Sequence, residues 1–383
     1  MKQSLLFLLL ILSIQVWAQP QTLKGRIVDA GTQEGVAYTN IGIEGTFYGT
    51  ASNADGFFEL KVPEEFADGK MLVSAVGYEN KNLQIRDLLG KEFIRIPLSE
   101  QTYRIEGVDV AAQSRVLFRI VRTAARQVPE NYFTGPLGLK FYYQEEKQVN
   151  DTTRQTREAV VELYDETGYS KPSVTNAFLS RKYHFLQVKK NFDSWSFPSG
   201  ETGFDELLNM DLARLSNTIF DEELLNDYDL QLEGVSLYEG DSVWVISYKT
   251  TMPGLARSGD YYATRMDGKM YVLKKNYALI RNECIIEAAR NNGQDRSLFT
   301  KSNEQRKVRY HFTSAYREQN GKYALSYLDC DKTYTDPQGE RISYTRKASV
   351  LDLQTSPAKI SGRDFFENTP YVENFWNSFN RPL

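Results

Sequence analysis

Three segments decide the fold of the N-terminal part of the chain: Gly25-Arg-Ile-Val-Asp29, Gly35-Val-Ala-Tyr-Thr-Asn-Ile-Gly-Ile43 and Thr50-Ala-Ser-Asn-Ala-Asp-Gly-Phe-Phe-Glu-Leu60. Short runs of β-branched and apolar residues alternate here with turns of Gly, Asn and Asp. Strands are therefore predicted at Leu23–Val28, Val36–Ile43, Phe57–Val62, Met71–Val76, Lys81–Ile85 and Phe93–Leu98. Between two of them, Asp55 offers the backbone a side-chain acceptor and Gly56 tolerates a positive φ, which predicts a structural turn. Six or seven strands at this spacing predict an antiparallel β-sandwich.

The order of these segments, followed by Val76-Gly-Tyr78, resembles the carboxypeptidase-regulatory-like domain. The resemblance implies a transthyretin-like, seven-stranded β-sandwich over residues 19–98. In peptidases such a domain accompanies a separate zinc domain and performs no chemistry itself. The resemblance therefore implies a binding or scaffolding role rather than a peptidase.

The first 18 residues have the pattern of a secretory signal. Lys2 precedes the apolar run Leu5–Ile14, and cleavage is predicted between Ala18 and Gln19. The run is too short to span a bilayer, although a membrane anchor is the alternative. We expect an exported protein, located in the periplasm or at the outer-membrane surface, that does not span a membrane once the signal is removed.

The overall charge disfavours a nucleic-acid partner. The chain has 46 Lys and Arg against 50 Asp and Glu, a formal net charge of −4. Nucleic-acid-binding domains are usually basic. The 24 Tyr and 21 Phe suit β-sheets, in which aromatic side chains pack on a pleated surface.

Residues 99–136 are predicted to form a connector and one amphipathic helix, Gln113–Val128, which Pro129 ends. Its apolar face is predicted to contain Val116, Leu117, Ile120, Val121, Ala124 and Val128. Four arginines recur on its other faces: Arg115, Arg119, Arg122 and Arg126. They are interpreted either as an anion site or as a solvated face.

The last part of the chain, residues 137–383, is predicted to be a β-rich domain with a few helices, including Phe204–Leu215. Its strands are predicted at Leu139–Glu145, Glu158–Tyr164, Asp229–Glu239, Val243–Thr250, Tyr261–Met266, Lys269–Lys274, Tyr277–Ala288, Lys307–Glu318, Lys322–Tyr334 and Glu340–Asp352. Asn150–Thr153, Glu239–Ser242, Asp267-Gly268 and Asn320-Gly321 are the predicted turns. Long strands in succession predict one curved antiparallel sheet or a partial barrel.

Part of this region is similar to envelope proteins of the lipoprotein-carrier type. The similarity lies in Asp241–Tyr248 and in Gly268–Ile280, a strand that ends in Tyr-Ala-Leu-Ile. It implies an open half-barrel wrapped on helices, with an apolar cavity. The complete layout also resembles secreted envelope proteins of the Bacteroidota.

Two cysteines leave one disulfide open. Cys284 and Cys330 lie in separate predicted strands, and an exported protein can form a bridge. The alternative is a pair of buried free thiols.

Familiar catalytic motifs are missing from the sequence. After the signal, His184 and His311 are the two histidines, and neither belongs to a His-Glu-x-x-His or His-x-x-Glu pattern. There is no Gly-x-Ser-x-Gly elbow and no phosphate-binding Gly-rich loop. We therefore expect no cofactor, no metal and no enzyme activity of the carboxypeptidase type.

Carboxylates leave one enzymatic alternative, because a glycosidase needs two of them. The densest groups are Asp205/Glu206, Asp221/Glu222/Glu223 and Asp227/Asp229, which are otherwise read as a solvated face. A calcium site at Asp55 is disfavoured, since a calcium loop needs several spaced carboxylates.

Aromatic residues near predicted loops are the candidate ligand contacts. They are Trp195, Tyr261 and Tyr262. Each could stack on a sugar, or pack in the core. The aromatic tail Tyr371–Asn380 is predicted to pack back on the β-rich domain.

Three functions are thus open. The first is a non-catalytic envelope protein that binds or scaffolds a partner through the sandwich and the curved sheet. The second is a carrier of a lipid or another hydrophobic ligand in a half-barrel cavity. The third is a glycan-acting enzyme.

Overall fold

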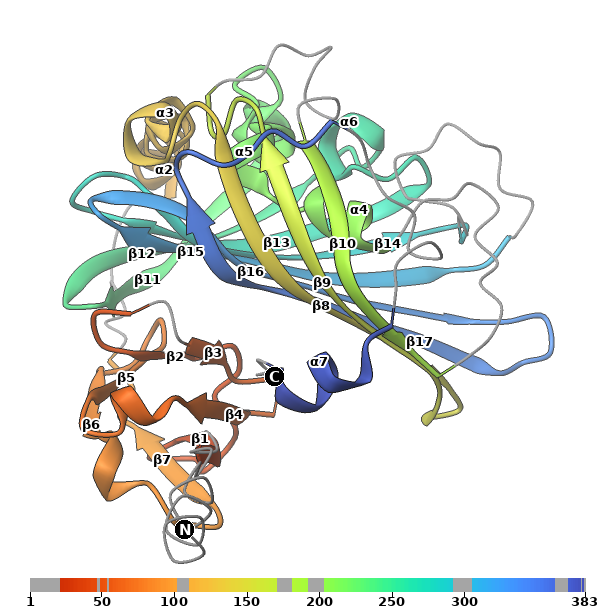
Figure 1. Ribbon diagram of the computed structural model, residues 1–383. Helices are drawn as coiled ribbons and strands as arrows, with labels where there is room; N and C mark the ends of the chain where they lie inside the picture. Colours follow the sequence, from red (N-terminus) through yellow and green to blue (C-terminus); the bar gives the residue numbers. More distant parts are fainter. Residues whose placement is uncertain are drawn as a thin grey trace, which may run out of the picture. The chain divides into compact units, whose positions relative to one another are not determined.

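A computed structural model describes residues 21–46, 49–53, 55–101, 110–170, 181–191, 203–291, 305–361, 371–379 and 381. The chain forms two compact units (Figure 1). Unit 1 contains residues up to Val73, Lys81–Leu98 and the last four residues. Unit 2 contains Ser74–Asn80 and Ser99–Phe379. The predicted signal, with Ala18 and Gln19, lies outside the described residues.

Unit 1 is built from two small sheets. Its strands are β1 (Gln21–Asp29), β2 (Asn40–Ile43), β3 (Gly49–Ala51), β4 (Phe57–Val62), β5 (Lys70–Ser74), β6 (Lys81–Gln84) and β7 (Ile94–Leu98). The sheets have the orders β4-β1-β7 and β3-β2-β5-β6. Two 3₁₀ turns, Glu64–Phe66 and Ile85–Asp87, connect them. The seven described strands agree with the predicted sandwich.

One pairing in unit 1 differs from the predicted antiparallel arrangement. β1 pairs antiparallel with β4 but parallel with β7. Parallel neighbours need a long crossover connection, and here the chain passes through the other sheet before it returns beside β1. The alternation of apolar and polar residues along a strand does not show whether its neighbour runs parallel or antiparallel.

The turn before β4 depends on a different acceptor from the one expected. Asn53 Oδ1 accepts hydrogen bonds from the backbone N–H groups of Asp55 (3.0 Å) and Phe57 (2.9 Å). Gly56 has φ +84°, and a Cβ there would lie 2.3 Å from the carbonyl oxygen of Ile27. The turn is structural as predicted, but Asn53 rather than Asp55 supplies its side-chain acceptor.

Unit 2 is dominated by one open antiparallel sheet. Its strands are β8 (Leu137–Val149), β9 (Thr152–Asp165), β10 (Arg181–Lys190), β11 (Tyr228–Tyr238), β12 (Asp241–Thr250), β13 (Ala263–Leu273), β14 (Leu279–Ala288), β15 (Val308–Gln319), β16 (Lys322–Thr335) and β17 (Arg341–Gln354). They lie in the order β10-β9-β8-β17-β16-β15-β14-β13-β12-β11. The sheet curves without closing (Figure 1), which confirms the predicted fold class.

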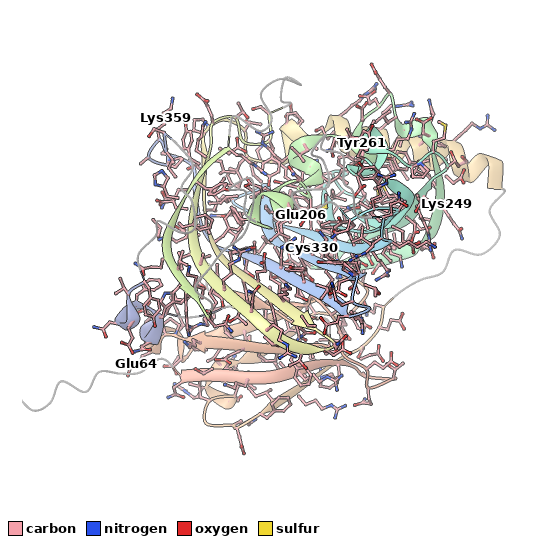
Figure 2. All side chains as sticks on the ribbon, turned by 90° about the vertical axis from the view of Figure 1, so that its right-hand side faces the viewer. Glu64, Glu206, Lys249, Tyr261, Cys330 and Lys359 are labelled. Atoms are coloured by element: carbon pink, nitrogen blue, oxygen red, sulfur yellow. The ribbon has the colours of Figure 1, made fainter. Side chains whose placement is uncertain are left out.

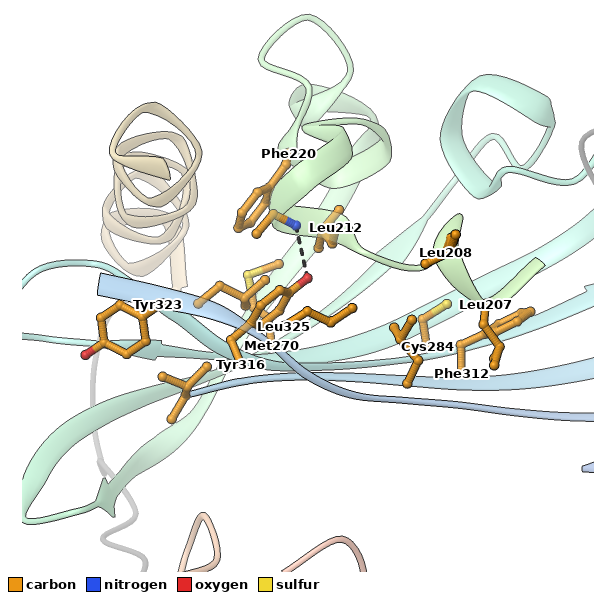
Figure 3. Close-up of a cluster of buried hydrophobic side chains, with 14 of the residues drawn as sticks. Leu207, Leu208, Leu212, Phe220, Met270, Cys284, Phe312, Tyr316, Tyr323 and Leu325 are labelled. Atoms are coloured by element: carbon orange, nitrogen blue, oxygen red, sulfur yellow. Dashed lines mark hydrogen bonds between the residues drawn. The ribbon is translucent and has the colours of Figure 1, made fainter. Parts of the chain in front are cut away.

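Short helices cover one face of this sheet. They are α2 (Val110–Arg126), α3 (Val128–Asn131), α4 (Gly203–Leu208), α5 (Leu212–Leu215) and α6 (Leu255–Ser258), with 3₁₀ turns at Thr218–Phe220 and Leu225–Asp227. Between helices and sheet lies a continuous apolar core. In Figure 3, Tyr316 of β15 stands under Leu212 and Phe220, and its hydroxyl accepts a hydrogen bond from the backbone N–H of Ala213 at 3.1 Å. We call the sheet face toward this core the inner face.

The helix predictions are correct in place but not in every boundary. In α2, Leu117, Ile120, Val121 and Ala124 are buried, as expected from their spacing, whereas Val116 is 44% exposed. Pro129 does not end the helical run, because it occupies the first turn of α3, where a missing N–H costs nothing. The predicted helix at Phe204–Leu215 is divided into α4 and α5, and the Asp211 side chain caps α5.

Three of the four predicted turns of unit 2 are confirmed by positive φ values at their central residues. Asn320 and Gly321 have φ +51° and +77°, and equivalent values occur at Asn150-Asp151 and Glu239-Gly240. The prediction at Asp267-Gly268 is wrong, because both residues lie inside the continuous strand β13. A Cβ at Gly268 would lie 2.4 Å from the hydroxyl of Tyr248 on β12. Because glycine has no side chain, the Tyr248 ring can lie against strand β13. Close approach of another group is a common reason for a glycine inside a strand.

Two strands were not predicted, β3 in unit 1 and β10 in unit 2, whereas the position of the tail is confirmed. β10 lies in a region for which no strand was predicted. The tail helix α7 (Glu373–Ser378) packs Trp376 against Tyr142 and Val160 of the sheet, as predicted.

Candidate functional site

Two rows of mostly polar side chains cross strands β11 to β15, on the sheet face opposite the inner face. Residues directly opposite one another on neighbouring strands point to the same face. By strand register the first row is Gln231, Ser247, Lys269 and Glu283. The second row is Asp229, Lys249, Asp267, Ile285 and His311. Figure 2 places Lys249 at the periphery of the molecule.

These rows line a groove with a volume of about 1290 Å³. The lining also reaches the inner-face core, because it includes Tyr248, Met266 and Cys284 together with Ser114 and Phe118 of helix α2. The groove exceeds the roughly 300–1,000 Å³ of most small-molecule sites, so it can hold an extended ligand. Because most of the lining comes from paired strands, its polar groups are held at fixed spacings.

Most charges of the groove are already paired with one another. Lys249 lies 3.7 Å from Asp229, and Arg265 lies 2.6 Å from Asp267. Glu283 forms an ion pair with Arg281 at 2.8 Å and accepts a hydrogen bond from the Tyr271 hydroxyl at 3.3 Å. Lys269 forms no ion pair with any residue in the described part of the chain. Its ammonium group is therefore the cation in the groove that remains available to a ligand.

His311 lies at the far end of the second row. Burial lowers its pKa below the usual 6.5, although Glu283 and Asp331 act in the opposite direction. The imidazole is therefore neutral at pH 7 and presents one donor and one acceptor nitrogen. A neutral hydrogen-bonding ring and an available cation in the same groove suit a ligand that carries hydroxyl groups and an acidic group.

The inner face contains a buried ion cluster, which we call the Arg346 cluster. It consists of Arg157 on β9, Glu145 on β8, Arg346 on β17 and Glu206 on α4. The first three are direct cross-strand neighbours. Glu145 accepts from Arg157 at 2.6 Å and from Arg346 at 2.7 Å, and Arg346 also donates to Glu206. All four side chains are buried.

This cluster makes stability depend on acid. Burial alone would raise the pKa of Glu145, but Arg157 and Arg346 outweigh it and lower that pKa to about 2 from 4.5. A carboxyl with a lowered folded-state pKa stabilises the fold above its unfolded-state value. We expect about 3 kcal/mol of stability to be lost as the pH falls from about 4.5 to about 2. Urea unfolding across this range measures it, and Glu145→Gln should flatten the dependence. An equally steep acid dependence in that variant would contradict the assignment to Glu145.

A second buried network, the Asp165 cluster, joins the end of β9 to β10 and α5. Asp165 accepts from Arg181 at 2.9 Å and from Arg214 at 2.7 Å. Asp211 accepts from Arg181 at 2.5 Å and from the Tyr316 hydroxyl at 3.1 Å. Burial would raise the pKa of Asp165, but the two guanidinium groups lower it. Neither cluster is readily predicted from the sequence, because its members lie far apart along the chain.

Side chains fill the inner face where a carrier would hold its ligand. The pocket found on this face measures about 40 Å³ and is lined by Met210, Leu212, Phe312 and their neighbours. That is room for water rather than for a lipid, because ligand sites usually exceed roughly 300 Å³. This pocket is therefore too small to be the cavity implied by the lipoprotein-carrier resemblance.

The two cysteines are both buried and are not joined by a disulfide. Cys284 on β14 and Cys330 on β16 lie in one cross-strand row, but Phe312 of β15 lies between them. Two strand spacings amount to about 10 Å, beyond the roughly 7 Å that a disulfide can bridge. The open disulfide alternative is thus resolved as two buried thiols.

The carboxylate groups considered for catalysis do not form one site. Glu206 is buried in the Arg346 cluster instead of on a solvated face, and Asp205 accepts from the Tyr183 hydroxyl at 2.8 Å. Glu222 is the partner of Arg126 (2.8 and 2.6 Å), so this arginine of α2 is used at the surface in an ion pair. Asp227 pairs with Arg257 at 2.6 Å.

The two described tyrosines that were predicted to contact a ligand differ in their exposure and packing. Tyr261 is 52% exposed and forms an edge contact with Tyr262, whose ring packs against the core and under Arg290. Neither tyrosine lines the groove. Trp195 lies outside the described residues.

No group of three or more His, Cys, Asp or Glu side chains in the described ranges is arranged to hold a metal ion. Among the described helices, none is both long and apolar enough to cross a bilayer.

Comparison with known proteins identifies one domain. Residues 23–110 match the CarboxypepD_reg-like domain, which confirms the resemblance found in the sequence. The comparison with curated proteins found no match. Among solved structures, a DUF1329 family protein from Desulfovibrio piger is similar at 10% identity and a TM-score of 0.29, covering 65% of this chain and 95% of that one. Lipovitellin is similar at 9% identity and a TM-score of 0.28, covering 60% of this chain and 26% of that one. Both are distant similarities.

Proposed function

We propose that this chain is a non-catalytic binding protein of the cell envelope, and that the groove on β11 to β15 takes an oligosaccharide with an acidic group. Export is inferred from the signal pattern of residues 1–18. The sandwich of unit 1 would serve as the module that docks on another envelope component.

The observation that carries the proposal is the pair of polar rows on rigid strands. A sugar is recognised by several hydrogen bonds to neighbouring hydroxyls, which requires donors and acceptors at regular spacings. Gln231, Ser247 and His311 offer both kinds of group. Lys269 would pair with a carboxylate of the ligand.

The state of the buried carboxylates supports a role without catalysis. A glycosidase needs one carboxyl with a raised pKa as its acid. The pKa of Glu145 is instead held near 2, and that of Asp165 is also lowered. Both are bound by arginines inside the core. They hold the sheet together and are not placed to donate a proton to a substrate.

Lys269→Ala should weaken binding of a uronic-acid-containing oligosaccharide about tenfold or more, because a hydrogen bond to a charged group is lost. The measurement is calorimetric titration of the full mature chain against a panel of neutral and acidic oligosaccharides. Gln231→Ala should weaken neutral and acidic members alike, because the Gln231 side chain lies in the first polar row and carries no charge. Lys347→Ala is the control, since Lys347 belongs to β17, beyond the groove.

Three results would contradict the proposal or part of it. Absence of binding across the whole panel would refute the glycan proposal. Unchanged affinity in Lys269→Ala would remove this lysine from the site. A stoichiometric lipid in the organic extract of protein purified from its native envelope would favour the carrier hypothesis.

A further inference from the structure

The outward face of the three-stranded sheet in unit 1 has an unusual composition. β1, β4 and β7 turn Leu23, Ile27, Phe58, Ile94 and Ile96 inward, where they are buried. The alternate positions face outward, and they include Lys24, Arg26, Phe57, Glu59, Lys61 and Arg95. Phe93 immediately precedes β7 on the same side. We call this surface the arginine–phenylalanine face.

The centre of this face is a tight arrangement of two rings and two guanidinium groups. Arg26 lies directly opposite Phe57 on one side and Arg95 on the other. Its guanidinium carbon lies 5.0 Å from the centre of the Phe57 ring. The rings of Phe57 and Phe93 are 6.3 Å apart and remain 43% and 53% exposed. Large apolar side chains exposed together in this way often mark an interface.

The positive charge of this face is only partly neutralised. Lys24 pairs with Glu59 at 3.2 Å. Arg26 donates to the backbone carbonyl of Asp55 at 2.8 Å, and Arg95 donates to the side-chain amide of Gln33 at 2.9 Å. In the described part of the chain neither arginine meets a carboxylate. Two like charges on neighbouring strands destabilise a sheet. Arg26 and Arg95 form such a pair, although the net charge of the whole chain is −4.

We propose that the arginine–phenylalanine face is a docking site for an acidic segment of a protein partner that also carries an apolar side chain. Carboxylates would bind the guanidinium groups in the fork geometry that arginine favours. The apolar side chain would cover Phe57 and Phe93. Arginine and aromatic residues together are the usual composition of an interface centre.

The geometry favours a protein segment over a lipid surface. The Phe57 ring lies under a guanidinium group, so its face is occupied by a cation and does not project outward for insertion between acyl chains. The face belongs to a sheet with Gln33 and Glu59 beside the cations, which gives it polar groups of both kinds. A polypeptide matches that mixture better than a uniformly anionic membrane.

The test uses the full mature chain and a fluorescein-labelled peptide of 12 residues that contains Asp, Glu and two Phe. Binding is measured by fluorescence anisotropy at 50 and 200 mM salt, beside vesicles that contain phosphatidylglycerol. We expect binding of the acidic peptide that weakens with salt. Phe93→Ser/Arg95→Glu should weaken it at least tenfold. Arg26→Lys keeps the charge but loses the fork, and should weaken it less.

The matched control is Lys81→Glu on β6, which makes the same change of charge on the other sheet of unit 1. Phe93 and Arg95 are exposed, so the double variant should keep its melting temperature, which verifies that it is folded. Equal affinities of the double variant and the wild-type chain would overturn the proposal, as would the absence of peptide binding. Binding to vesicles but not to peptide would assign the face to lipid instead. Oligosaccharide binding in the groove is expected to stay unchanged in every one of these variants.

Discussion

Replacing Arg346 by Ala is expected to lower the free energy of unfolding by about 3 to 5 kcal/mol. Arg346 is buried between Glu145 and Glu206 and donates to both. Its removal leaves two carboxylates inside the core with Arg157 as the cation bound to Glu145. Breaking a buried pair from one side is costly because the remaining charge keeps its desolvation penalty without its partner.

Urea unfolding of the wild-type chain and of this variant at neutral pH measures the difference. Arg341→Ala is the matched control, because Arg341 lies on the same strand, is largely exposed and pairs with Asp151 at 3.1 Å at the surface. Surface pairs contribute about 0 to 1 kcal/mol, so the control should unfold almost like the wild type. Similar losses in the two variants would mean that the Arg346 cluster is less important than its burial indicates.

Asp165→Ala is expected to lower the free energy of unfolding by a comparable amount, about 3 to 5 kcal/mol. Here the removed group is an anion, and the charges left in the core are cations. Asp165 accepts from Arg181 and Arg214, and also from the backbone N–H groups of Thr167 (3.1 Å) and Gly168 (3.0 Å). Without it, Arg214 loses its ion pair with Asp165, Arg181 keeps its ion pair with Asp211, and the turn after β9 loses its acceptor.

A second variant separates charge from volume at this position. Asp165→Asn has nearly the same shape, so the stability it loses reports on the missing charge, while the further loss in Asp165→Ala reports on the missing atoms. Asp229→Ala is the control, since Asp229 is exposed on the edge strand β11. Full stability of Asp165→Asn would contradict an electrostatic role for this cluster.

These two clusters also bind the helices to the inner face of the sheet. Helices α4 and α5 are bound to the sheet by Glu206 and by Asp211 with Arg214, so the inner face is held against its cover by buried ion pairs. Opening that face would separate charges in a medium of low dielectric constant. In Figure 2, Glu206 and Cys330 lie in the interior of the molecule, within this packed region.

The sequence by itself determined the features that depend on neighbours along the chain. Alternation revealed most strands, the spacing of Leu117, Ile120, Val121 and Ala124 revealed the buried face of α2, and Asn320-Gly321 revealed a hairpin. The segments around Gly25 and Asp55 were enough to recognise the CarboxypepD_reg-like domain. Each of these signals arises from local backbone preference or from one element meeting one apolar surface.

Only the tertiary structure decided which distant residues meet. Arg346 reaches Glu145 because β17 pairs with β8 in one register, and a shift of one residue would turn the two side chains to opposite faces. Gly268 reads as a turn until the Tyr248 ring is placed over it. The groove likewise exists because five strands align their polar positions in rows. Strand order and register are set by packing over the whole sheet, and no short segment contains that information.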